Sequence, residues 1–549
     1  MHPPKDPNYI PRVTIRDAHE LSAKLTGLVK YRTLKEILLQ GQTDLDYYDF
    51  EIAQLKALIG DLEAKRSCLD AYLQDCRSLI SPIQNLPPEL LSEIFMLTCD
   101  PAGSNEFGSA YWVPSGKPRH RPAFQLSTVC SRWRQVALST PGLWSKMNIS
   151  FVHSWPSWIP SAIETCLQRS RQVPLALSLE GSIDNLLRDD WRTVLSSLAQ
   201  QSHRWRSVSF NLAVKPSFRP NFIDLLSLHT FPLLHSLTIS AAGQWVTLPE
   251  HSVFRETPDL RLLQLNSETA AKSWHWSQGV YNHHITSLTL QYTNLRDTID
   301  ILRRCPGLVS LKYTHRLHKA EHIALRDNLE AGTVLPVCLE DLSSLSIITP
   351  QDNVSSTITL LGSLLQLPAL KSLTMEQISS YLFTDMSWME AFCVFLRETS
   401  CSDSLTKLRF KSFCPGDGID SMLSLVPNLK EFRFCSIRNA DADWDGIIAC
   451  LRLPPSGSSM DPPSTIFLPR LQHISLHIPH AASFDFDSFA EGIRSRRLPA
   501  SEISVDRLCS VGLKLKRSHL KILEDTYRYD DLLDLEVGGL IFGLELYGE

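Results

Sequence analysis

Residues 83–95 form the most informative stretch of the chain and read I-Q-N-L-P-P-E-L-L-S-E-I-F. Leu86, Leu90 and Ile94 recur at every fourth position, and this spacing places their side chains on one face of a helix. The two prolines fit the first turn of such a helix, where the backbone N–H groups have no intrahelical partner. The pattern therefore predicts a short helix with one apolar face.

A second apolar stretch reads V-C-S-R-W-R-Q-V-A at 129–137 and is followed by L-W at 143–144. Its spacing predicts another helix, capped by Ser127 and ended by the sequence S-T-P-G at 139–142. Two helices of this length cannot enclose a hydrophobic core by themselves. They therefore need the rest of the chain or a second protein to cover their apolar faces.

Together the two stretches resemble an F-box, the module that docks a protein onto the Skp-type adaptor of cullin-based ubiquitin ligases. The residues that carry the resemblance, and that it would assign to adaptor binding, are Leu86, Pro87, Glu89, Leu90, Ile94, Phe95, Val129, Cys130, Trp133, Leu143 and Trp144. Residues 100–122 form a long insertion rich in Pro, Gly and Ser, where many F-boxes have only a few residues. With this insertion the F-box spans 81–145 and is similar to the F-box-like form common in fungi.

The resemblance implies that the chain binds a Skp-type adaptor and, through it, a cullin. Apolar side chains of both helices would then make the anchoring contacts, as buried anchors do at protein interfaces. The transfer of ubiquitin would occur on other subunits, so this chain would position a target protein and form no bond itself. An ordinary helical hairpin with apolar faces is the alternative explanation of the pattern.

After residue 145 the chain repeats the pattern P-x-L-x-x-L-x-L, with helix-like stretches between the copies. The copies with a proline begin at Pro232, Pro258, Pro306, Pro368, Pro427 and Pro469. The pattern is similar to the leucine-rich repeat, in which strands and helices alternate and neighbouring units bury each other's apolar faces. The irregular spacing and the mostly missing Asn or Cys after the strand depart from that family. We predict an irregular α/β solenoid over 146–549, with a doubly wound α/β domain as the alternative.

Residues between the leucines of each predicted strand point away from the core. In a parallel horseshoe this outward set lines the concave face. Four cations of the set are the candidate substrate-binding residues: Lys312, Arg409, Lys411 and Arg433. Because clustered guanidinium groups bind anions well, we expect this face to receive an acidic or phosphorylated segment. The alternative is that these charges only keep the strand face soluble.

The segment before the F-box carries apolar residues at alternating spacings of three and four. The series, interrupted only by Arg66, is Leu45, Tyr48, Ile52, Leu55, Ile59, Leu62, Leu69, Leu73, Cys76 and Ile80. This heptad pattern predicts a long helix over 44–80, preceded by a flexible N-terminal region over 1–43. Two alternatives stay open: a coiled-coil homodimer through residues 45–80, or one helix packed against the rest of the chain.

Composition limits the function classes. The net charge of −5 does not favour nucleic acid as the main partner, and the N-terminal sequence lacks the apolar core of a secretory signal. No apolar run reaches the 18 residues that a membrane span needs, which favours a cytoplasmic or nuclear protein. The sequence contains no P-loop, G-x-S-x-G or H-E-x-x-H motif, and its 13 cysteines form no C-x-x-C pair. We therefore expect no enzyme activity, no cofactor and no metal.

The predicted architecture is an α+β multi-domain chain with an N-terminal coiled-coil-like helix, a small all-α F-box and a leucine-rich-repeat-like solenoid. The function that it implies is the substrate-recognition subunit of an SCF-type (Skp-cullin-F-box) ubiquitin ligase. The alternative is a non-catalytic scaffold or assembly protein whose F-box has no ligase role.

Overall fold

The structure is a computed structural model of the 549-residue chain. The residues that it describes are 12, 27–99, 111–112, 122–151, 158–182, 189–213, 229–242, 257–267, 284–293, 295–315, 335–350, 354–378, 387–416, 418–436, 444–453, 466–479, 484–497, 505–517 and 540–547. Most of the predicted insertion at 100–122, and all but residue 12 of the first 26 residues, lie outside this set. The chain forms two compact units, Met1–Leu91 and Ser92–Glu549.

The first unit is dominated by one long helix, α2 (Gly27–Ile80), followed by the short 3-10 helix η1 (Pro82–Asn85). The heptad prediction for 44–80 falls entirely on α2. However, the helix begins at Gly27, so the prediction of a flexible region up to residue 43 is corrected for residues 27–43. Lys35, Glu36 and Leu38 are strong helix formers, and their propensity carries the helix through this segment.

Four short helices follow, and they correspond to the two predicted apolar stretches: α3 (Pro88–Cys99), α4 (Pro122–Val129), α5 (Ser131–Ser139) and the 3-10 helix η2 (Pro141–Trp144). Pro88 occupies the first position of α3, as predicted from its missing N–H group. The single helix predicted from Ser127 is divided in two, because Cys130 adopts an extended backbone with φ −156° and ψ 172°. The predicted end within residues 139–142 is confirmed, because α5 ends at Ser139.

The second unit is built on one large parallel sheet, to which the described residues contribute 15 strands. The strands are β1 (Tyr111–Trp112), β2 (Lys146–Phe151), β3 (Leu175–Ser182), β4 (Trp205–Ala213), β5 (Ser236–Ala242), β6 (Leu262–Ser267), β7 (Ser287–Thr293), β8 (Ser310–His315), β10 (Ser344–Pro350), β12 (Ser372–Ile378), β13 (Lys407–Phe413), β14 (Glu431–Ser436), β15 (His473–Ile478), β16 (Ser510–Lys516) and β17 (Ile541–Tyr547). Their spatial order follows the chain order throughout, with a separate two-stranded pair of β9 (Val337–Cys338) and β11 (Leu365–Gln366). A doubly wound fold would reverse its strand order at a switch point, and this sheet does not.

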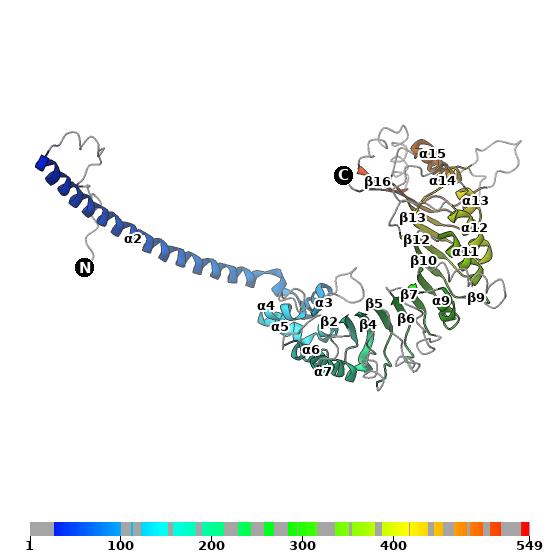
Figure 1. Ribbon diagram of the computed structural model, residues 1–549, viewed down its shortest axis with the longest axis horizontal. Coiled ribbons are helices and arrows are strands. Elements are labelled where there is room, and N and C mark those ends of the chain that lie inside the picture. Colours follow the sequence, from blue (N-terminus) through cyan, green and yellow to red (C-terminus); the bar gives the residue numbers. More distant parts are fainter. Residues whose placement is uncertain are drawn as a thin grey trace. The chain divides into compact units, whose positions relative to one another are not determined.

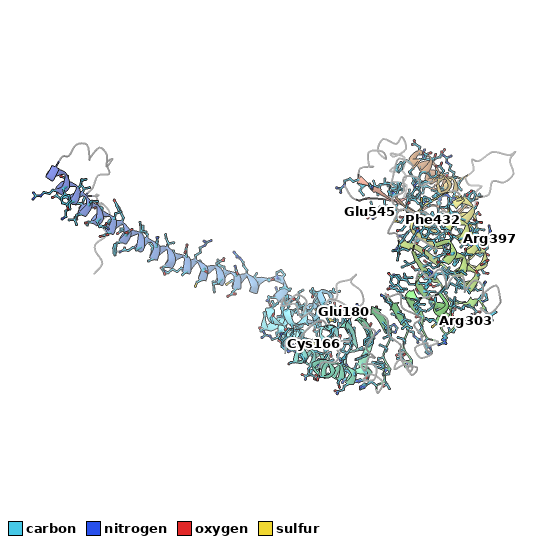
Figure 2. The ribbon with its side chains drawn as sticks, viewed as in Figure 1. Cys166, Glu180, Arg303, Arg397, Phe432 and Glu545 are labelled. Atoms are coloured by element: carbon cyan, nitrogen blue, oxygen red, sulfur yellow. The ribbon has the colours of Figure 1, made fainter. Side chains whose placement is uncertain are left out.

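Helices cover one face of the sheet (Figure 1). They are α6 (Trp158–Arg169), α7 (Asp189–Gln200), α9 (Leu295–Leu302), α11 (Val354–Leu364), α12 (Trp388–Glu398), α13 (Ile419–Ser424), α14 (Asp445–Leu451) and α15 (Phe486–Arg497). Helix α12 shows why the helices pack on the sheet. Its residues Trp388, Phe392 and Phe395 recur at helical spacing and are buried, so they form one apolar face. Arg303 and Arg397 lie on this helical side, whereas Glu180 and Glu545 lie on the opposite side (Figure 2).

The repeated sequence pattern determines the register of the sheet. Leu237 on β5 pairs with Leu263 on β6, which pairs with Leu288 on β7, and all three are buried. The alternating residues face the other way, so that Thr238 pairs with Gln264 and that residue with Thr289. One sheet face is therefore an apolar core, and the other is a polar open face.

One buried arginine connects helix α15 to the end of α14 by hydrogen bonds. Arg496 of α15 is fully buried, and its guanidinium group donates hydrogen bonds of 2.6–2.8 Å to the carbonyl oxygens of Cys450, Leu451, Phe467 and Leu468. Burial lowers the pKa of Arg496 to about 10. The side chain thus satisfies carbonyl groups at the end of α14 that have no intrahelical donor.

Candidate functional site

Helix α3 presents an apolar face to solvent. Leu90, Ile94 and Leu97 follow the spacing i, i+4 and i+7, and their exposed fractions are 48%, 38% and 70%. On the other face of the same helix, Leu91 and Phe95 are buried, with exposed fractions of 0% and 1%. One side of α3 therefore anchors the helix, and the other offers aliphatic surface to a partner.

Burial divides the residues that the F-box resemblance assigned to adaptor binding. Phe95, Leu143 and Trp144 are buried within the chain, so they stabilise the helices and cannot themselves form the contact surface. Trp133 is half-buried, and its ring centroid lies 4.8 Å from that of Phe95. Such aromatic pairs contribute stability beyond their buried area.

The remaining assigned residues are accessible to different degrees. Pro87, Glu89 and Val129 are exposed, and Leu86 is half-buried. Cys130 is half-buried and caps α5, because its Sγ accepts a hydrogen bond from the backbone N–H of Trp133 at 3.4 Å. Its thiol therefore stabilises the start of a helix, a role that the sequence pattern did not indicate.

Trp144 joins α4 and α5 to helix α6. Its indole Nε1–H donates to the carbonyl oxygen of Ala137 at 2.8 Å, which satisfies a carbonyl group near the end of α5. Its ring packs edge-on against Phe124 of α4 at 5.0 Å. The guanidinium carbon of Arg169, at the end of α6, lies 4.5 Å from the ring centroid, within cation–π range.

A second candidate site lies on the open face of the sheet at β13 and β14. We call Lys407, Arg409, Lys411 and Arg433 the basic cluster. Lys407, Arg409 and Lys411 occupy alternating positions of β13, and Arg433 on β14 pairs directly with Arg409. The sequence pattern identified three of these residues and missed Lys407, although its position before the first strand leucine could have revealed it.

Glu431 lies at the base of the basic cluster. Its carboxylate is 2.6 Å from Nε of Arg433, 3.5 Å from Nζ of Lys407 and 3.6 Å from a terminal nitrogen of Arg409. The Glu431 side chain is only 15% exposed, whereas those of its three partners are 40–61% exposed. Burial raises the pKa of the Glu431 carboxyl group, but the charges of Arg433 and Lys407 outweigh this and hold the pKa below its ordinary value.

Lys312 does not belong to the basic cluster. It lies on β8, and the strands β10 and β12 separate it from β13. Lys312, Ser346, Thr374 and Arg409 are paired in turn across neighbouring strands and so form one row across the sheet. The two residues of this row between Lys312 and Arg409 carry no charge. The predicted group of four cations therefore contains three that the fold brings together and one that stands apart.

Next to the basic cluster, Cys435 and His477 pair across β14 and β15, with 2.9 Å between Sγ and Nδ1. Burial raises the pKa of the Cys435 thiol despite the neighbouring lysines, Lys514 and Lys411. Burial also lowers the pKa of His477. Both shifts favour the neutral forms over the thiolate that a cysteine nucleophile requires.

None of the described helices is both long and apolar enough to cross a membrane. Nor does any group of three or more His, Cys, Asp and Glu side chains among the described residues have the arrangement of a metal site.

Comparison with known proteins supports the first candidate site. Residues 83–150 match the model of the F-box-like family. The matched residues of this chain comprise α3, α4, α5, η2 and the greater part of β2. No curated protein matches the chain. The chain therefore contains a domain similar to the F-box-like family, and such domains generally bind Skp-type adaptors.

Proposed function

We propose that this chain is the substrate-recognition subunit of an SCF-type ubiquitin ligase. The observation that carries the proposal is the exposed aliphatic face of α3, which lies within the residues that match the F-box-like family. An adaptor that covers Leu90, Ile94 and Leu97 would remove this apolar surface from water, which favours association.

The parallel sheet would hold the protein to be ubiquitylated. We interpret it as a leucine-rich-repeat solenoid, because the repeated pattern falls on consecutive strands and the helices cover one face. The open face would then bind the target, with Arg409, Lys411 and Arg433 as the candidate residues that the fold brings together. In this proposal the chain has no catalytic residue, and the cytosol or nucleus would be its compartment.

Affinity capture with matched variants tests the proposal. We expect Ile94→Asp to abolish recovery of a Skp-type adaptor and a cullin, because a carboxylate would be desolvated in the contact. Val309→Asp is the control, since Val309 is an apolar residue of similar exposure, 41% against 38% for Ile94, outside the F-box-like domain. If wild type and the Val309 variant also recover no adaptor, the ligase role is wrong.

A second candidate function is assembly, and a specific feature of α2 favours it. Its heptad residues other than Cys76 are exposed, among them Leu45, Ile52 and Leu62 at 57%, 47% and 56%. In a parallel pair of α2 helices, Glu51 would face Lys56 of a second copy. We therefore propose that α2 forms a homodimer, which is compatible with either function.

A further inference from the structure

We propose that the basic cluster binds an extended acidic peptide segment with anionic side chains at alternating positions. This inference rests on the proposed function, since it names the kind of target segment that the open face receives. The shared chemistry is anionic oxygen, supplied by carboxylates or by phosphate groups. It goes beyond a general binding face, because it places recognition on two adjacent strands and excludes Lys312.

The spacing of the basic cluster sets the form of the ligand. Lys407, Arg409 and Lys411 share one face of β13, because Leu408 and Phe410 between them are buried in the core. Residues two apart in a strand are about 6.8 Å apart. An extended peptide has the same repeat, so acidic residues at every second position would match the cations one for one.

The burial of Glu431 and its ion pairs hold the side chains of the cations in place. A mostly buried carboxylate contacts three more exposed cations, and its shortest contact is to Nε of Arg433 at 2.6 Å. A guanidinium group bound through Nε keeps its terminal nitrogens for a second anion. Glu431 thus fixes the direction of the side chains before a ligand arrives, which reduces the entropy lost on binding.

The charge balance of the region also favours an anion. Lys411 has its own carboxylate, with 3.1 Å between its Nζ and Glu376. Together Glu376 and Glu431 face the four cations of the basic cluster, so positive charge is in excess there. Nearer the start of the sheet, the same row carries uncharged side chains such as Thr238, Gln264 and Thr289. The excess is therefore local.

A peptide fits this surface better than a nucleic acid does. Single-stranded nucleic acid binds on basic grooves with aromatic side chains for base stacking. The open-face positions that flank the cluster on β12 and β15 hold no Phe, Tyr or Trp; they are Ser372, Thr374, Glu376, His473, Ser475 and His477.

Fluorescence anisotropy with the purified full-length chain tests this inference. The probes are three labelled peptides of one sequence, with glutamate, phosphoserine or glutamine at alternating positions. We expect the glutamate and phosphoserine peptides to bind at least about tenfold more tightly than the glutamine peptide. The tighter of the two identifies which source of anionic oxygen the surface prefers.

Variants then locate the binding. Arg409→Gln with Arg433→Gln should weaken the anionic peptides at least about tenfold, while Lys312→Gln, the matched cation of the same row, should change binding by less than about twofold. Thermal unfolding checks that each variant is folded, and single Arg433→Gln replaces the double variant if it is not. Equal affinity for all three peptides, equal loss in the Lys312 variant, or stronger competition by single-stranded RNA of equal charge would each overturn the inference.

The result is independent of the F-box. The peptide assay needs no adaptor, and the basic cluster variants should still capture a Skp-type adaptor if the proposed function is correct. Failure of peptide binding with adaptor capture intact would reject only this inference. Peptide binding without adaptor capture would reject only the ligase role.

Discussion

At the scale of single residues, burial separates side chains that the sequence pattern could not distinguish. Leu90 and Phe95 both fit the F-box resemblance, yet Leu90 is 48% exposed and Phe95 is buried. A helical stripe identifies apolar residues but not which of two neighbouring stripes packs inside, because that depends on α4 and α5. Glu431 was missed for a similar reason: strand register brings it next to Lys407 and Arg433.

The Glu431 carboxylate should make stability depend on pH. Its pKa is lower in the folded chain than its ordinary value of 4.5, so folding favours the ionised form. This contribution is present above about pH 4.5 and is lost as the pH falls through the folded-state pKa. We therefore expect Glu431→Gln to reduce the loss of unfolding free energy below pH 4.5, measured by urea denaturation at a series of pH values.

Arg433 provides the check on that explanation. Because its charge is the largest of the effects that lower the pKa of Glu431, Arg433→Gln should also reduce the acid dependence. Adding Glu431→Gln to the Arg433 variant should then change the loss of unfolding free energy below pH 4.5 by less than it does in the wild type. Full additivity of the two substitutions would contradict the assigned cause.

At the scale of elements, helix type and position were predictable, and helix continuity was less so. The heptads predicted α2, but its start at Gly27 follows from helix propensity rather than from an apolar stripe. The break between α4 and α5 was missed, because Val129 and Trp133 keep helical spacing across it. Only the extended backbone of Cys130 shows that the second stretch is two helices.

The proposed α2 homodimer gives a prediction at this scale. Light scattering of the full-length chain should give twice the 62.0 kDa mass of one chain. Ile52→Asp with Ile59→Asp should return it to the single-chain mass, since both residues lie on the heptad stripe and would place carboxylates in the contact. Ala57→Asp with Ala64→Asp, on the outer face of the same helix, should leave the dimer intact. A single-chain mass for the wild type would contradict the prediction.

At the scale of the whole molecule, the repeated pattern predicted most of the sheet. Each quoted copy falls on a strand, because alternating leucines need one buried face and their neighbours need one open face. Strand β17 (Ile541–Tyr547) was not among the strands that the pattern predicted. The partner chemistry of the open face was only partly predictable: the separation of Lys312 from the basic cluster depends on how many strands lie between them.

We propose that the domain at 83–150 binds a Skp-type adaptor through the exposed face of α3. The most direct measurement is calorimetric titration of the purified full-length chain with a purified Skp-type adaptor. We predict a dissociation constant of about 1 µM or tighter for wild type and for Val309→Asp, and binding at least about thirtyfold weaker for Ile94→Asp. No binding by folded wild-type protein, or equal binding by the Ile94 variant, would contradict the account.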